Sequence, residues 1–151
     1  VFSKAVIMSI VGQFFVHLMS LLCALKLCEV YSPVQEDSVL LSPDGRFQPN
    51  LVNSAVFLLS SVIQINNFVV NYRGAPFTQN IQENTTLWRS VQVLYGSVAV
   101  AASGILEPLN DLLQLAPFPS ENPEFKSYLM LLLVINFGVA YTVEYLCRKV
   151  E

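Results

Sequence analysis

Amide side chains within a strongly apolar stretch are the residues of this sequence whose types and spacing could support chemistry. Residues 62–72, VIQINNFVVNY, carry Gln64, Asn66, Asn67 and Asn71 among aliphatic and aromatic neighbours. A buried amide costs free energy unless another polar group pairs with it. Such side chains therefore either bond to neighbouring helices or line a polar path for a substrate or ion.

The helical period arranges these amides in stripes. At 100° per residue, one stripe of residues 51–72 consists of Asn53, Ser60, Gln64, Asn67 and Asn71. Asn66 falls outside it, roughly 220° round from Asn53. A second stripe, spanning roughly 80° of arc, consists of Ser9, Gln13, His17 and Ser20. Interhelical packing is the favoured interpretation, because no carboxylate, the stronger indication of a transport path, lies in the middle of these segments.

Two titratable side chains, His17 and Glu144, also have either a structural or a functional interpretation. His17, one turn from Gln13, could belong to a proton relay, but a neutral histidine bonded to a neighbouring helix is favoured, since its own apolar segment carries no acidic partner. Glu144, beside Tyr141 and Tyr145, is predicted to anchor its helix at the membrane interface. We predict no catalytic, cofactor-binding or metal-binding residue. The polar residues predicted to pack helices together are Gln13, His17, Asn53, Gln64, Asn67, Asn71 and Asn136.

The composition indicates an integral membrane protein. Of the 151 residues, 54% are hydrophobic and only 13% are charged, whereas soluble domains carry roughly 25% charged residues. The three cysteines, Cys23, Cys28 and Cys147, show no metal-binding or redox spacing and are predicted to be unpaired. No basic patch suited to nucleic acid is present.

Charges and prolines divide the chain into four apolar segments, each near the roughly 20 residues that a membrane-spanning helix needs. We therefore expect an all-α membrane protein, a bundle of four transmembrane helices. The expected helices cover residues 5–26, 51–72, 88–106 and 125–146. The connecting loops are 27–50 and 107–124 on one side and 73–87 on the other, and residues 107–125 contain a short amphipathic stretch expected on the membrane surface.

The distribution of lysine and arginine predicts the orientation of the chain. An even number of spans places both termini and loop 73–87 on one side, together with five of the eight basic residues. The positive-inside rule then places that side in the cytosol and the other two loops in the lumen. The glycosylation sequon at Asn84–Thr86 tests this orientation, because a cytosolic sequon stays unmodified.

Several longer strings resemble a known family. They are GQFFVHLMSLL (12–22), the stretch 47–84 with its PNLVN and VNYRGAPF ends, and PLNDLLQLAPFP (108–119). In order and spacing they resemble the C-terminal membrane region of type 5A P-type ATPases, the transmembrane-helix dislocases of the endoplasmic reticulum. The resemblance implies that the four spans are the last four of ten core helices. It also implies that they form a supporting bundle with both ends of the segment in the cytosol.

The same resemblance implies an enzyme that the present residues do not contain. Family members use ATP and Mg²⁺, through an aspartyl-phosphate, to extract mistargeted transmembrane helices from the endoplasmic reticulum membrane. Their Asp-Lys-Thr-Gly-Thr loop is missing from this sequence, so the chain alone is expected not to hydrolyse ATP and is interpreted as a fragment. Its expected partners are membrane lipid, the remaining helices and cytosolic domains of the parent ATPase, and the parent's transmembrane-helix clients. The alternative is a stand-alone four-span scaffold or adaptor without enzymatic activity.

Overall fold

The computed structural model describes residues 3–31, 49–74, 76 and 78–150. Within them the chain forms five α-helices and no strand. The helices are α1 (Lys4–Tyr31), α2 (Leu51–Asn71), α3 (Thr85–Ser103), α4 (Glu107–Leu112) and α5 (Glu124–Val150). The expectation of an all-α membrane protein is confirmed, since α1, α2 and α5 are each long and apolar enough to cross a membrane.

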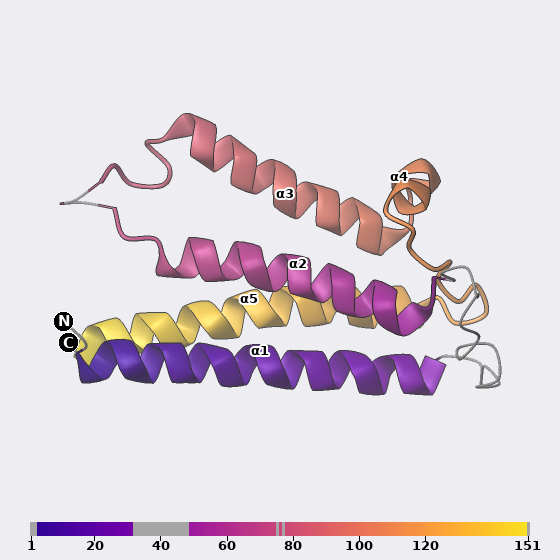
Figure 1. The fold of residues 1–151 in the computed structure, drawn as a ribbon, viewed down its shortest axis with the longest axis horizontal. Helices are drawn as coiled ribbons and strands as arrows, with labels where there is room; N and C mark the ends of the chain where they lie inside the picture. Colours follow the sequence, from indigo (N-terminus) through magenta and orange to yellow (C-terminus); the bar gives the residue numbers. More distant parts are fainter. Residues whose placement is uncertain (1–2, 32–48, 75, 77, 151) are drawn as a thin grey trace, which may run out of the picture.

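The four long helices alternate in direction along the bundle. Figure 1 shows α1, α2 and α5 side by side, with both chain ends at the same end of the bundle. Helix α3 returns alongside α2 and diverges from it toward the end where residues 72–84 connect the two. Its first half carries Arg89 and Gln92, so α3 is less apolar than the three candidate spans. The fourth span therefore remains a prediction.

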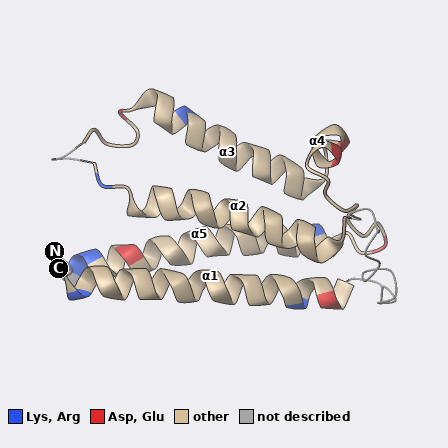
Figure 2. Cartoon of the chain, viewed as in Figure 1, with Lys and Arg blue, Asp and Glu red and all other residues tan. Residues whose placement is uncertain are grey.

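Charged residues mark the ends of the long helices. In Figure 2 the middle of α1, α2 and α5 is uncharged, and the ribbon segments coloured blue for Lys and Arg gather at the end where both termini lie. Helix α1 continues past Lys26, which pairs with Glu29 at 2.5 Å, to Tyr31. The expected helix 5–26 is therefore longer by more than one turn, because two opposite exposed charges at i and i+3 are compatible with a continuing helix.

Local capping fixes where the second and third helices begin and end. The Asn50 side chain accepts a hydrogen bond of 2.7 Å from the Asn53 amide at the start of α2. Asn84 caps α3 in the same way, at 3.1 Å from the Leu87 amide. Gly104 ends α3 in the left-handed conformation, φ +67°, which glycine adopts without steric penalty. Caps thus define the start of α2 and both ends of α3.

The apolar core fills the half of the bundle away from the termini. Its largest fully buried members are Phe125, Leu58, Leu59 and Leu129. Tyr31 closes this end with an edge-to-face contact to Phe125 at 5.9 Å between ring centres. The loop after α4 docks here as well, since the Ala116 amide donates to Ser54 Oγ at 2.7 Å. Helix α4 itself has no buried residue, and its position on a membrane surface remains a prediction.

Helices α1 and α5 approach each other closely near the opposite end. A Cβ atom placed on Gly12 would lie 2.7 Å from Val143 Cγ1. The valine is β-branched and stiff about χ1, so it could not yield easily to a larger residue. Glycine at this position therefore allows the tight contact of the two helices, which form the most extensive helix pair of the structure.

Candidate functional site

Helix α1 turns its polar side toward the other helices. Ser9, Gln13, His17 and Ser20 are buried, and they lie between small or weakly polar buried residues, Ala5, Ala24 and Cys28. The large apolar side chains of α1 point outward, among them Met8, Val11, Phe15 and Met19. Such an inverted helix is stable only where lipid or other protein covers its apolar side, because water would not solvate it.

A buried carboxylate lies at the end of α5 nearest the termini. Glu144 is 6% exposed and accepts hydrogen bonds from Ser9 Oγ, from Gln13 Nε2 at 3.3 Å and from Arg148 Nε at 2.6 Å. Arg148 also donates to the Val70 carbonyl of α2 at 3.1 Å. Glu144 therefore joins α1 to α5 and, through Arg148, α5 to α2. The prediction that Glu144 is a simple interfacial anchor is wrong, because its carboxylate points into the bundle.

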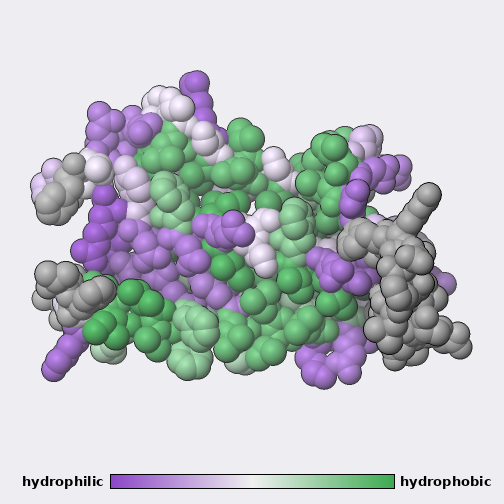
Figure 3. Space-filling view, viewed as in Figure 1, coloured by the Kyte–Doolittle hydropathy of each residue, from purple (hydrophilic) through white to green (hydrophobic). Residues whose placement is uncertain are grey.

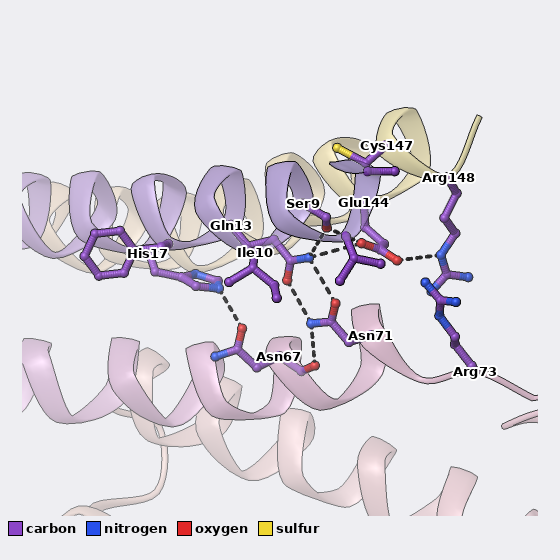
Figure 4. A pocket seen from close by; sticks show the side chains of 13 residues that line it. Ser9, Ile10, Gln13, His17, Asn67, Asn71, Arg73, Glu144, Cys147 and Arg148 are labelled. Atoms are coloured by element: carbon purple, nitrogen blue, oxygen red, sulfur yellow. Dashed lines mark hydrogen bonds and ion pairs between the residues drawn. The ribbon is translucent and has the colours of Figure 1, made fainter. Parts of the chain in front are cut away.

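Two pairs of polar side chains connect α1 to α2. Gln13 Nε2 donates to Asn71 Oδ1 at 3.0 Å, and Asn71 Nδ2 donates back to Gln13 Oε1 at 2.9 Å. One turn further on, His17 Nε2 contacts Asn67 Oδ1 at 3.0 Å. Figure 4 shows these contacts as a ladder between the two helices. Each residue satisfies polar groups of the other helix that lipid could not satisfy.

Asn136 of α5 joins the same helices further inside the bundle. Its amide nitrogen lies 3.1 Å from His17 Nδ1 and 2.8 Å from Ser20 Oγ. Its oxygen accepts a hydrogen bond of 2.8 Å from Asn66 Nδ2, and Tyr95 of α3 donates to Asn66 Oδ1 at 2.6 Å. A neutral His17 with its proton on Nε2 satisfies every contact, with Nδ1 accepting from Asn136.

These contacts form one continuous polar network, which runs from Arg148 through Glu144, Gln13, Asn71, Asn67, His17, Asn136 and Asn66 to Tyr95. It contains residues of all four long helices. Networks that are fully hydrogen-bonded hold helices in a single arrangement, because each member left unpaired would be costly. The network therefore fixes the four long helices relative to one another.

A cavity adjoins the network where α1 begins and α2 and α5 end. Its volume is about 520 Å³. The lining includes polar members of the network together with Arg73 and the apolar Val6, Ile10 and Phe14. In Figure 4 the guanidinium groups of Arg73 and Arg148 lie near each other at one edge, beyond Glu144. Small-molecule sites have volumes of roughly 300–1,000 Å³, and the volume of this cavity falls within that range.

The structure brings together five of the seven polar residues predicted from the sequence. Gln13, His17, Asn67, Asn71 and Asn136 all lie in the network. Among the described residues, no hydrogen bond joins the side chain of Asn53 or Gln64 to another helix. Gln64 is exposed and lines a groove between α2 and α3, while Asn53 is exposed near the start of α2.

Of the α2 stripe, only Asn67 and Asn71 hydrogen-bond to α1. Near the start of α2 the core side meets α1 instead, since Cys28 Sγ donates to the Leu51 carbonyl at 3.7 Å.

The stripe pattern missed Asn66, because this residue lies outside the α2 stripe on the helical wheel. It is fully buried because it lies on the core side of α2 with Leu58, Leu59, Val62 and Val70. The signal that could have identified it is a single amide on an otherwise apolar side of the helix. Water does not reach such a position, so the amide must pair with another group of the protein. Tyr95 gave no comparable signal, since tyrosine is common near membrane interfaces.

Comparison with known proteins gives the family likeness. No family model matches the chain. A probable manganese-transporting ATPase of Arabidopsis thaliana is 35% identical over 98% of the chain. The endoplasmic reticulum transmembrane helix translocases of Aspergillus fumigatus and Saccharomyces cerevisiae are 31% and 30% identical over 95% and 96% of it.

The chain resembles the C-terminal region of the type 5A P-type ATPases. It spans only 11–12% of the length of these type 5A relatives. The likeness inferred from the strings at 12–22, 47–84 and 108–119 is therefore confirmed.

Proposed function

We propose that this chain is the C-terminal supporting membrane bundle of an ATP-driven type 5A translocase. In this proposal the parent extracts mistargeted transmembrane helices from the endoplasmic reticulum membrane, and both ends of the present segment lie in the cytosol. The match to relatives over almost the whole chain carries the proposal. Three of the relatives are named helix translocases and one a manganese transporter, which favours helices as the cargo.

The polar network favours a static, supporting role for these helices over a moving one. A helix that shifted during a transport cycle would have to break and remake its buried hydrogen bonds. Here α1, α2, α3 and α5 are joined by amide, histidine and carboxylate contacts with few alternatives nearby. A bundle held in this way provides a fixed base for helices that move.

The exposed polar side of α2 supports incorporation into a larger protein. In Figure 3 hydrophilic side chains gather over the C-terminal half of α2, between the hydrophobic surfaces of α1 and α3. Gln64, Asn67 and Asn71 are exposed there. Lipid cannot satisfy amides at membrane depth, so this side is expected to contact other helices of the parent or a water-filled cavity.

ATP and Mg²⁺ would be bound by parts of the parent outside these residues. The Asp-Lys-Thr-Gly-Thr loop that would form the aspartyl-phosphate is missing from this sequence. The present residues would contribute neither a phosphate acceptor nor a nucleotide contact. Their part in the cycle would be positional: they would hold the membrane region in place while the cytosolic catalytic domains act.

The first experiment is to sequence the transcript upstream of Val1. An in-frame Asp-Lys-Thr-Gly-Thr codon run several hundred codons upstream is the expected result. A stop codon followed by a start codon directly before Val1 would contradict the proposal and leave a four-span scaffold or adaptor.

The second experiment tests the supporting role in the complete protein. Asn67→Leu removes the bond to His17, and Asn53→Leu is the matched control because the Asn53 side chain has no interhelical bond. We expect Asn67→Leu to lower thermal stability while ATPase activity per folded molecule stays near that of the unmodified protein. A large loss of activity at unchanged stability would instead identify Asn67 as part of a polar pathway.

A further inference from the structure

A groove of about 440 Å³ runs along the boundary of α2 and α3. The α2 residues that line it recur every three or four positions and so share one side of the helix; they are Phe57, Ser61, Gln64 and Phe68. The α3 residues that line it include Leu94, Ser97, Val98 and Ala101. Phe57 and Phe68 are 11 positions apart, so the groove follows about three turns of α2. In Figure 3 hydrophilic colour lies on this boundary, between hydrophobic surfaces.

Gln64 is the polar side chain of this groove that no described residue pairs with. It is exposed, and its amide makes no hydrogen bond to any residue that the structure describes. The two serine hydroxyls of the groove donate to carbonyls of their own helices, Ser61 to Phe57 at 2.8 Å and Ser97 to Val93 at 2.8 Å. The opposite wall therefore offers the Gln64 amide no partner.

The position of Gln64 along α2 places this amide at membrane depth. Helix α2 runs from Leu51 to Asn71, so Gln64 is 13 positions from its start and 7 from its end. These separations correspond to about 20 Å and about 10 Å along the helix axis, within a hydrocarbon core roughly 30 Å thick. A lipid chain in the groove would leave the amide unpaired, because lipid tails offer neither donor nor acceptor. A helix with a polar side chain at this level would pair it.

The lining of the groove also suits a helix. Small residues let a neighbouring helix approach closely, and three of them lie in the groove: Ser61, Ser97 and Ala101. Its large apolar members are about half exposed, which leaves their free surface available to an occupant; they are Phe57, Phe68 and Leu94. The groove thus combines close approach, apolar contact and one amide.

We propose that a transmembrane helix preceding Val1 in the complete protein lies in the groove between α2 and α3 and presents a neutral hydrogen-bonding side chain to Gln64. This inference rests on the proposed function, since the chain resembles the C-terminal region of its relatives and spans only 11–12% of their length. An amide offers donors and an acceptor but no charge to balance an ion at this depth. The matching side chain is therefore an asparagine, glutamine, serine or threonine.

The test uses the complete protein in its native membrane, with a photoreactive diazirine amino acid placed at Leu94. This residue lines the groove and is 52% exposed. Val93 is the matched control, because it is the preceding residue of α3 and is 66% exposed but does not line the groove. Mass spectrometry of the crosslinked peptides identifies what each probe reaches. We expect the probe at Leu94 to link to one apolar segment upstream of Val1, and the probe at Val93 not to reach that segment.

Adducts of the Leu94 probe with lipid or water alone would overturn the proposal, as would a link to a second copy of the chain or to another protein. ATPase activity of the same preparation separates this failure from a failure of the proposed function. An active ATPase whose groove meets only lipid contradicts the groove proposal alone. A complete protein without an ATPase region upstream of Val1 contradicts the proposed function itself.

A substitution at Gln64 tests the hydrogen bond by the sign of its effect. In Gln64→Leu the polar side chain of the occupant loses its partner, so the unfolding temperature of the complete protein should fall. If the groove faced lipid, the same change would remove an unpaired amide and raise that temperature. Asn53→Leu is the control, since Asn53 is an exposed amide of the same helix outside the groove. An unfolding temperature of Gln64→Leu that is not below that of Asn53→Leu would overturn the bond.

Discussion

Asn66 of α2 donates a hydrogen bond of 2.8 Å to Asn136 of α5, and both side chains are fully buried. The pair lies where the apolar core gives way to the polar network. It joins two residues that are 70 positions apart in the chain, and Tyr95 extends the contact to a third helix. No other described residue offers Asn66 a polar partner, so the pair is specific as well as buried.

Substituting Asn66 by leucine should destabilise the complete protein. The change leaves Asn136 Oδ1 and the Tyr95 hydroxyl without their partner in a region that water does not reach. A buried group left unpaired costs roughly 1–3 kcal/mol, and interhelical bonds in membranes fall toward the lower end. Thermal unfolding in detergent measures the effect. Asn53→Leu, exposed near the start of the same helix, should change stability little; equal losses in both variants would contradict the importance of the pair.

Replacing Glu144 by alanine should loosen the end of the bundle nearest the termini. Ser9 and Gln13 would lose an acceptor, and Arg148 would lose its partner at 2.6 Å. Hydrogen bonds to a charged group contribute roughly 1.5–3 kcal/mol, so a loss of about 2 kcal/mol in unfolding free energy is expected. Glu144→Gln retains acceptor capacity on one oxygen and should lose less. An alanine variant as stable as the unmodified protein would show that the carboxylate is not structural.

Adding a single methyl group at Gly12 should separate α1 from α5. The new Cβ would lie 2.7 Å from Val143 Cγ1, and overpacking of this kind typically costs roughly 1–3 kcal/mol. Val143→Ala in the same chain should restore most of the loss, which a double-mutant cycle measures. Gly96→Ala is the matched control, since a Cβ there meets nothing within 4 Å, and it should raise stability slightly through helix propensity. A cycle without coupling would contradict the close contact.

The glycosylation state of Asn84 tests the orientation of the bundle. Asn84 caps α3 at the end where both termini lie. If that end is cytosolic, treatment with a glycosidase leaves the mobility of the protein unchanged on a gel. Glu36→Asn, which completes a sequon over residues 36–38 in the loop expected in the lumen, should add a glycan. A glycan at Asn84 and none at the new site would invert the orientation.

The sequence predicted the helices better than their mutual contacts. Apolar length alone located α1, α2 and α5, because a run of about 20 apolar residues has few other structures available. It could not show that α1 continues to Tyr31, since Lys26 and Glu29 resemble a helix end until their pairing is known. The expected helix 88–106 joins the C-terminal part of α3 to residues that follow Ser103, where the helix itself ends.

The candidate site was predictable only in part, and Gln13 and Asn66 show why. Gln13 lies on a visible stripe whose facing partner, Asn71, lies on another. Asn66 lies opposite its stripe, yet it is the more deeply buried of the two. A helical wheel shows which residues share a side, but the number of neighbouring helices decides how many sides are buried. Helix α2 has three neighbours, α1, α3 and α5, so amides on different sides find partners.

The inverted arrangement of α1 bears on how the chain enters a membrane. Ribosomes deliver helices in order, and the polar groups of α1 find partners on both α2 and α5. Ser9 precedes Glu144 by 135 residues, and His17 precedes Asn136 by 119. During cotranslational insertion Gln13 and His17 can pair with α2 first, whereas the contacts of Ser9 and Ser20 with α5 form only once α5 emerges. Because lipid cannot satisfy these hydroxyls, we expect this side of α1 to remain beside protein or water until then.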